Sequence, residues 1–220
     1  MGDFINQWGS AIGQGFIETV EMTIISLVIS LIIGVLLAIL LVLTRKGGQA
    51  ENPYVYSFLN VLINVIRSIP FIILLFFILP FTQAVAGTTI GVRGVIVPLV
   101  VACAPYIARL LESAMLEVDH GIIEAYQSMG ISTPRIIWFV VVREARSSII
   151  LGLTIATISL IGETAMAGFV GAGGLGDLAY QFGYVRFQPN VMYAVIIILI
   201  VIVQILQSIG TGIARKLKKN

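Results

Sequence analysis

Residues 22–44 read MTIISLVISLIIGVLLAILLVLT, a run of aliphatic and small residues without a single charged side chain. A helix that crosses the hydrocarbon core of a bilayer needs about 20 consecutive, mostly apolar residues. An uninterrupted stretch of this length and composition is typical of a transmembrane helix. The segment therefore predicts a membrane span and decides the class of the fold.

The composition of the whole chain agrees with an integral membrane protein. Of the 220 residues, 58% are hydrophobic and 11% are charged, and the mean hydropathy is +1.04. A soluble domain carries about 25% charged residues, so this chain has too little polar surface to cover a water-exposed globule. The formal net charge of +2 provides no broad basic field for nucleic acid. We therefore expect membrane lipid to surround the protein and no nucleic acid to bind it.

Four further apolar stretches predict additional spans, which makes about five membrane helices in all. They lie at about 58–81, 94–116, 147–170 and 187–214. Pro70 is expected to distort the first turn of the lipid-embedded part of the span at 58–81. The remaining segments are too short to close a globular core by themselves. The chain thus predicts an all-α fold with one transmembrane domain over residues 1–220.

The basic residues are distributed unevenly between the predicted loops. The loops at 83–93 and 171–186 contain only Arg93 and Arg186. The other side of the membrane receives nine bases, namely Arg45, Lys46, Arg135, Arg143, Arg146, Arg215, Lys216, Lys218 and Lys219. Lys and Arg accumulate on the cytoplasmic side of membrane proteins. The asymmetry predicts a cytoplasmic C-terminus and, with an odd number of spans, an N-terminus outside.

The longest segment on the predicted cytoplasmic side, about 117–146, contains two short helices separated by a break. Asp119 is a suitable N-cap for the first helix, and Gly130 suits the C′ position that ends it. Thr133 is expected to cap the second helix with Pro134 in its first turn. An apolar stripe runs along the first helix, formed by Val118, Ile122, Tyr126 and Met129. Such a stripe indicates either a helix lying on the lipid surface or a helix that docks into a groove of a partner.

The sequence from Glu124 to Gly130 resembles the EAA loop of ABC importer permeases. Ala125 and Gly130 match that motif, whereas Tyr126 replaces its second alanine. Further along, Arg143 stands where the motif has a proline. In the family this loop forms the helix that docks on the ATPase. The resemblance therefore implies ATPase-coupling roles for Ile122, Glu124, Ala125, Tyr126, Met129 and Gly130.

Two other stretches are similar to the permeases of methionine ABC importers. One is RSIPFIILL at 67–75, and the other is GAGGLG at 171–176, followed by YQFGY at 180–184. The resemblance implies a type I permease in the bacterial cell (inner) membrane that moves D- or L-methionine by alternating access. It also implies a homodimer, two cytoplasmic ATPase subunits that bind ATP and Mg²⁺, and an extracytoplasmic substrate-binding lipoprotein. No cofactor is expected on this chain.

Glu163 is the acid deepest in any predicted span, and intramembrane carboxylates are usually paired or functional. The resemblance places Ser159, Glu163 and Met166 on the translocation pathway or its gate. No catalytic constellation and no Walker motif accompany them, so the chain is not expected to be an enzyme. Three alternatives stay open: a permease for another small polar solute, a gradient-driven transporter using Glu163, and a structural membrane protein.

The predicted orientation can be tested with cysteines placed at the two ends of a Cys103→Ala background. A cysteine at Gly2 is expected to react with an impermeant thiol reagent added outside intact cells, because an odd number of spans puts this end outside. A cysteine at Asn220 is expected to stay unlabelled until the cells are opened. Labelling of both termini from the same side would show that the number of spans is even.

Overall fold

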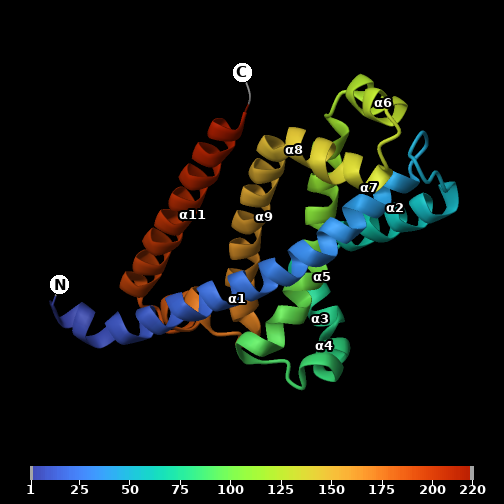
Figure 1. The fold of residues 1–220 in the computed structure, drawn as a ribbon. Helices are drawn as coiled ribbons and strands as arrows, with labels where there is room; N and C mark the ends of the chain where they lie inside the picture. Colours follow the sequence, from blue (N-terminus) through green and yellow to red (C-terminus); the bar gives the residue numbers. More distant parts are fainter. Residues whose placement is uncertain (1, 219–220) are drawn as a thin grey trace. The chain divides into compact units, whose positions relative to one another are not determined.

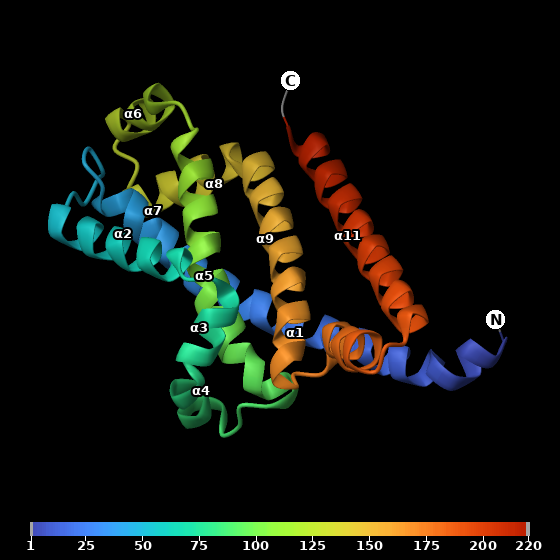
Figure 2. The ribbon, with the colours of Figure 1, turned by 180° about the vertical axis from the view of Figure 1, so that it is seen from behind.

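The computed structural model describes residues 2–218, and every regular element within this range is a helix (Figures 1 and 2). Four helices are long and apolar enough to cross a membrane. They are α1 (Gly2–Thr44), α5 (Gly91–Leu116), α9 (Arg146–Ala167) and α11 (Pro189–Leu217). The predicted all-helical membrane fold is confirmed.

The second predicted span, 58–81, is broken rather than distorted. It consists of α2 (Pro53–Ser68), α3 (Phe71–Phe77) and α4 (Leu79–Ala86). Pro70 has an extended backbone, with φ −55° and ψ 136°. A proline cannot donate the helical hydrogen bond, and its ring disfavours helical geometry at the residue before it. If α2 and α3 together count as one span, the described chain has five.

Helix α1 begins about twenty residues before the predicted span at 22–44. Hydropathy locates the span after Glu21, but the helix itself already starts at Gly2. One side of its first turns is apolar and packed, because Phe4, Trp8 and Ile12 contact a buried cluster around Leu175. Tertiary packing therefore extends a helix that hydropathy alone would begin later.

The chain divides into two compact units. Unit 1 comprises Met1–Ser30, Ile69–Cys103 and Thr157–Leu206, and unit 2 comprises Leu31–Ser68, Ala104–Ala156 and Gln207–Asn220. Both loops predicted to be extracytoplasmic belong to unit 1, and both long loops predicted to be cytoplasmic belong to unit 2. Among the described Lys and Arg residues, only Arg93 and Arg186 lie in unit 1. Loops that the Lys and Arg content predicts on one side of the membrane therefore belong to the same unit. Which side is cytoplasmic stays a prediction.

In unit 1, a glycine-rich connection follows α9. It contains η2 (Gly168–Val170), α10 (Gly174–Leu178) and the π-helix η3 (Ala179–Val185). Gly171, Gly173 and Gly174 have φ of 74°, 81° and 83°, a region that suits glycine. A methyl group on Gly176 would collide with the backbone of Ala165. The glycine run therefore forms a tight, closely packed turn.

The same connection is held to the first part of α1 by side-chain acceptors. The Glu18 carboxylate accepts a hydrogen bond from the Gly174 N–H at 2.7 Å, and the Thr19 hydroxyl accepts one from the Leu175 N–H at 2.9 Å. The adjacent core contains Leu175, Val191 and Val195, all fully buried. Unit 1 therefore joins α1, α10 and α11 through hydrogen bonds and apolar packing together.

In unit 2, two apolar clusters surround the second half of α5. One contains Leu41, Leu59, Ile63 and Ala108, and it holds α2 against α1 and α5. The other cluster contains Ala114, Met115, Val118, Ile136, Val141 and Ala145. The second cluster lies where the predicted cytoplasmic segment folds back, and it supports the site described next.

Candidate functional site

The segment between α5 and α9 forms the short helix α6 (His120–Ser128), which Figure 1 shows beyond the end of α5. The Asp119 carboxylate caps it by accepting a hydrogen bond from the Gly121 N–H at 2.6 Å. This cap satisfies one of the N–H groups that a helix start leaves unpaired. The predicted N-cap at Asp119 is confirmed.

Helix α6 ends in a Schellman motif around Gly130, whose φ is 73°. The Gly130 N–H donates to the Gln127 carbonyl at 2.9 Å, and the Ile131 N–H donates to the Tyr126 carbonyl at 3.3 Å. These are the two bonds that define the motif, and they need a left-handed residue between them. The break predicted at Gly130 is therefore confirmed.

The chain then resumes as α7 (Thr133–Arg135), the π-helix η1 (Ile136–Val141) and α8 (Val142–Glu144). The predicted cap is wrong by one residue, because Ser132 occupies the cap position and Pro134 lies in the first turn after it. Ser132 has an extended backbone, and its carbonyl accepts from the Arg135 and Ile136 N–H groups at 3.0 and 3.1 Å. With Arg143 in place of a proline, the backbone stays helical through α8.

One face of α6 packs against its own protein. Ile123 and Tyr126 contact the cluster that contains Ile136 and Val141. Val118, just before the helix, belongs to that cluster and is 8% exposed. Val118 and Tyr126 therefore stabilise α6 on unit 2 and do not contribute freely to an outer surface. The predicted stripe is thus divided between two faces, and Ile123 was missing from it.

The opposite face of α6 is open. Ile122 is 37% exposed and Met129 is 63% exposed. Ala125 lies between them at helical spacing and is also exposed. Residues three and four apart share a helix face, so these three form one small apolar patch. We call Ile122, Ala125 and Met129 the outer face of α6.

Glu124 is exposed, but it is not part of the outer face. It lines a cavity of about 160 Å³ together with Gln127 and the segment around Arg45. The far wall of this cavity comes from η1. The segment 45–49 and η1 therefore support α6 from behind. The arrangement presents a short, buttressed helix whose apolar face is available to a groove.

The three predicted pathway residues share one side of α9. Ser159, Glu163 and Met166 are spaced by four and three residues, which is the period of a helix face. Ser159 is exposed and Met166 is 45% exposed, whereas Glu163 is partly buried. The structure thus brings the three residues together along one helix.

Buried polar atoms occur on Glu163 and on two serines of α1, Ser26 and Ser30, which were not among the predicted site residues. The Oε2 atom of Glu163 is buried without a hydrogen-bond partner among the described residues, and so is the Ser26 hydroxyl. Cys103, 2% exposed as expected of a small buried residue, lies close to both Glu163 and Ser30. The period of seven in Thr19, Thr23, Ser26 and Ser30 was the available signal for this polar stripe on α1.

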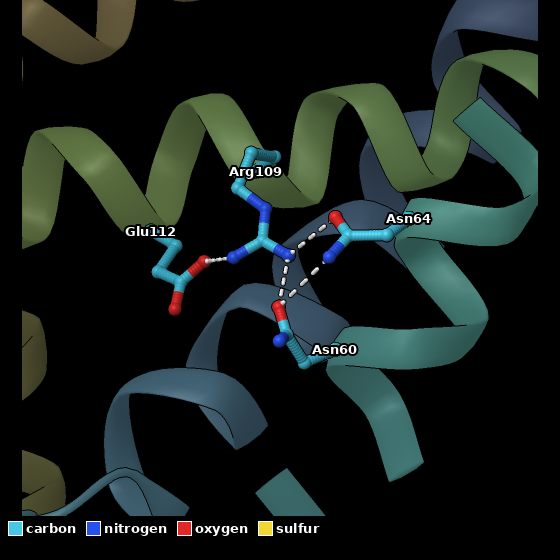
Figure 3. Close-up of polar contacts among 4 residues, drawn as sticks. All are labelled: Asn60, Asn64, Arg109 and Glu112. Atoms are coloured by element: carbon cyan, nitrogen blue, oxygen red, sulfur yellow. Dashed lines mark hydrogen bonds and ion pairs between the residues drawn. The ribbon is translucent and has the colours of Figure 1, made fainter. Parts of the chain in front are cut away.

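Arg109 forms the centre of a polar cluster between α2 and α5, drawn in Figure 3. Its guanidinium contacts the Glu112 carboxylate at 2.6 Å. It also donates to the side-chain oxygens of Asn60 at 2.5 Å and Asn64 at 3.1 Å. An arginine near the end of a span often extends toward the lipid headgroups. Arg109 pairs inward instead, because Glu112 is 2% exposed and a buried carboxylate requires a partner.

Arg67 behaves differently from Arg109. Its side chain is exposed, and its guanidinium lies 5.6 Å from the centre of the Tyr106 ring. A cation over an aromatic face is attracted by the ring quadrupole. Arg67 therefore contacts α5 without joining the cluster around Arg109.

Comparison with known proteins gives a consistent result. Residues 30–219 match the family of binding-protein-dependent transport system inner membrane components. The methionine import system permease of Bacillus subtilis is 44% identical over 177 residues, covering 80% of each chain. The probable D-methionine transport system permease of Pasteurella multocida is 41% identical and covers 93% of this chain and 94% of its own.

A solved structure agrees with these relatives. It is a chain from inward-facing conformations of the MetNI methionine ABC transporter, 39% identical, with a TM-score of 0.94. The alignment covers 97% of this chain and 99% of the solved one. A chain from an amino acid ABC transporter with histidines, 19% identical, shares the fold with a TM-score of 0.80.

The Arg109 cluster leads to a stability prediction. Arg109→Gln is expected to lower the free energy of unfolding by about 3 to 5 kcal/mol, because it leaves the Glu112 carboxylate buried without its ion pair. The measurement is denaturation of the purified protein in detergent. The double variant Arg109→Gln, Glu112→Gln is expected to recover most of this loss, since no buried charge remains.

Arg67→Gln is the matched control, because Arg67 lies on α2, contacts Tyr106 of α5 and forms no ion pair among the described residues. It is expected to change stability by less than about 1 kcal/mol. Equal losses in Arg67→Gln and Arg109→Gln, with no recovery in the double variant, would show that the ion pair contributes nothing specific.

Proposed function

The chain belongs to the family of binding-protein-dependent transport system inner membrane components, and from this premise we propose that it is the permease subunit of a methionine ABC importer. The observation that carries the proposal is identity of about 40% to methionine permeases over most of the chain. The similarity extends across the docking segment and the spans alike. The family resemblance drawn from the sequence motifs is confirmed.

The family also determines the kind of protein this is. It is a multi-pass permease of the inner membrane, and ATP is hydrolysed by a separate subunit of the transporter. The chain itself is therefore not an enzyme. Its task is to provide a path through the bilayer and to couple that path to a partner that hydrolyses ATP.

We propose four partners for the working transporter. Two cytoplasmic ATPase subunits bind ATP and Mg²⁺, so this chain needs no cofactor of its own. A second copy of the chain completes the translocation path. An extracytoplasmic lipoprotein delivers the substrate. The supporting observation for an ATPase partner is the buttressed α6 with its open apolar outer face.

The proposed coupling acts through α6. Ile122 and Met129 enter a groove of the ATPase, while Ile123 and Tyr126 keep the helix attached to unit 2. Because the inner face is packed, a movement of α6 is transmitted to the cluster around Ile136 and does not merely deform a loop. Closure of the ATPases on ATP then changes the accessibility of the path, and hydrolysis resets it.

The proposed path includes Ser159, Glu163 and Met166 on α9. Met166 is a flexible, exposed apolar side chain that suits a gate. The Glu163 carboxylate and the Ser26 hydroxyl each provide a buried polar atom of the kind that methionine's charged backbone groups require inside a membrane. Two finer points belong to the proposal alone: the stereoisomer of the substrate and the role of Glu163.

The transport proposal is tested by reconstituting the chain with its ATPase and binding lipoprotein in vesicles. Uptake of labelled methionine is expected to require ATP, because the energy for transport is proposed to come from ATP hydrolysis in the partner ATPase. Uptake is also expected to persist when the proton gradient is collapsed at constant ATP. Excess unlabelled methionine, but not serine, is expected to compete. Uptake driven by the gradient without ATP would favour the secondary-transporter alternative.

The docking role of α6 is tested at its outer face. Ile122→Asp is expected to reduce co-purification of the ATPase at least about tenfold, because docking would bury an unpaired carboxylate at a cost of several kcal/mol. Gly130→Val is expected to reduce coupled transport as well, since φ is 73° at this position and a β-branched residue is strained there. Co-purification and methionine uptake are measured at matched membrane expression.

Gln127→Asp is the matched control, because it adds the same charge to an exposed position of α6 outside the outer face. It is expected to leave ATPase co-purification within about twofold of the unchanged protein. Normal co-purification and uptake in both Ile122→Asp and Gly130→Val would rule out α6 as the coupling helix.

A further inference from the structure

A pocket rich in basic residues lies in unit 2, where α9 begins and α11 ends. Its volume is about 320 Å³. Its walls include Arg143, Arg146, Ser147, Leu151, Leu217 and Lys218. Figure 2 shows α8 and the start of α9 beside the C-terminal end of α11. We call this cavity the basic pocket.

Side-chain bonds from α9 to α11 build the basic pocket. The Arg146 Nε donates to the Leu217 carbonyl at 3.2 Å, and the Ser147 hydroxyl donates to the Ala214 carbonyl at 2.9 Å. The last carbonyls of a helix otherwise repel an anion, because they carry the negative end of the helix dipole. Here two of these carbonyls already accept hydrogen bonds from α9, and Lys218 follows them directly beside the arginines that line the pocket.

The electrostatic balance of the basic pocket favours an anion. Three bases, Arg143, Arg146 and Lys218, line it against one acid, Glu144. The first turn of α9 adds the positive end of a 22-residue helix. A guanidinium group also matches the geometry of phosphate oxygens through paired N–H donors.

The surroundings of the basic pocket are apolar. Leu151, which lines it, is 38% exposed, and Ile155 on the next turn of α9 is 47% exposed. On α11, Ile209 and Ile213 are 54% and 45% exposed. A ligand held here therefore has cationic groups at one end and uncovered aliphatic helix faces at the other. A soluble anion uses only the first of these features, whereas a phospholipid uses both.

We propose that the basic pocket binds the headgroup of an anionic phospholipid, with the acyl chains along the exposed aliphatic faces of α9 and α11. Basic pockets between transmembrane helices on the cytoplasmic side are suited to such headgroups. Arg143 and Lys218 are exposed and face the phosphate directly, while Arg146 also holds the pocket together.

The site depends on a departure from the motif of the docking loop. Arg143 occupies the position where that motif has a proline, and it supplies one wall of the basic pocket. The motif therefore does not account for the charge at this place. The lipid site is independent of the transported substrate, so it stands or falls separately from the proposed function.

The experiment is lipid retention by the complex of this chain with its ATPase, purified in detergent. The complex is incubated with an equimolar mixture of phosphatidylglycerol and phosphatidylcholine, and bound lipid is counted by native mass spectrometry. The unchanged protein is expected to retain phosphatidylglycerol selectively. Arg143→Gln and Lys218→Gln are each expected to weaken that retention about fivefold, and the double variant more strongly, since each base near an anionic lipid contributes comparably.

Lys216→Gln is the matched control, because Lys216 is an exposed base in the last turn of α11, two residues before Lys218, and does not line the pocket. It is expected to retain phosphatidylglycerol as the unchanged protein does. Arg146 is left unaltered so that the bonds holding α9 to α11 stay intact.

Four results would overturn the proposal. Equal retention of the two lipids by the unchanged protein would show that the site does not select an anionic headgroup. Equal retention of phosphatidylglycerol by the double variant and the control would show that Arg143 and Lys218 do not bind it. Displacement of the lipid by glycerol phosphate at comparable concentration would identify a site for free phosphate anions. Loss of the ATPase from the double variant, with lipid retention unchanged, would identify a protein contact.

Discussion

The absence of water from the hydrocarbon core of a bilayer is the constraint on which this structure depends. Backbone N–H and C=O groups must find partners within the protein, and a continuous helix supplies them along its whole length. Irregular backbone is tolerated only where other groups replace the missing bonds. The glycine-rich connection lies in a loop predicted to be outside the bilayer, and its backbone is also paired, because Glu18 and Thr19 accept hydrogen bonds from the N–H groups of Gly174 and Leu175. The glycines thus allow the backbone of the turn, and side chains of α1 accept the hydrogen bonds of its N–H groups.

The same constraint governs the charged side chains. Glu112 is buried, and the Arg109 guanidinium pairs with it while Asn60 and Asn64 accept the remaining hydrogen bonds. Glu163 carries a buried oxygen without such a partner among the described residues. Glu112 is therefore a structural element between two helices, and Glu163 is the acid that we propose for the path.

The packing of α6 explains how a short helix outside the spans can transmit movement. A helix of nine residues is too short to be stable alone in water. Here Asp119 caps it, Gly130 ends it, and Ile123 and Tyr126 attach it to a core that includes Ile136. The outer face of α6 stays exposed as a small apolar surface. A force applied to that face acts on the core, because the helix and the core are one packed body.

Local chemistry determined much of this protein from the sequence alone. Apolar length predicted the spans, and Asp119 and Gly130 predicted the ends of α6, because each depends on residues adjacent in the chain. Contacts between distant residues were decided only by the tertiary structure. Hydropathy could not show that Pro70 breaks a span completely or that Arg109 pairs inward. Helical periodicity placed Val118 and Tyr126 on one stripe with Ile122 and Met129. Periodicity gives the direction of each side chain around the helix axis, but it does not show which residues that side chain contacts. The tertiary structure divided that stripe, burying the side chains that face Ile136 and leaving the others open.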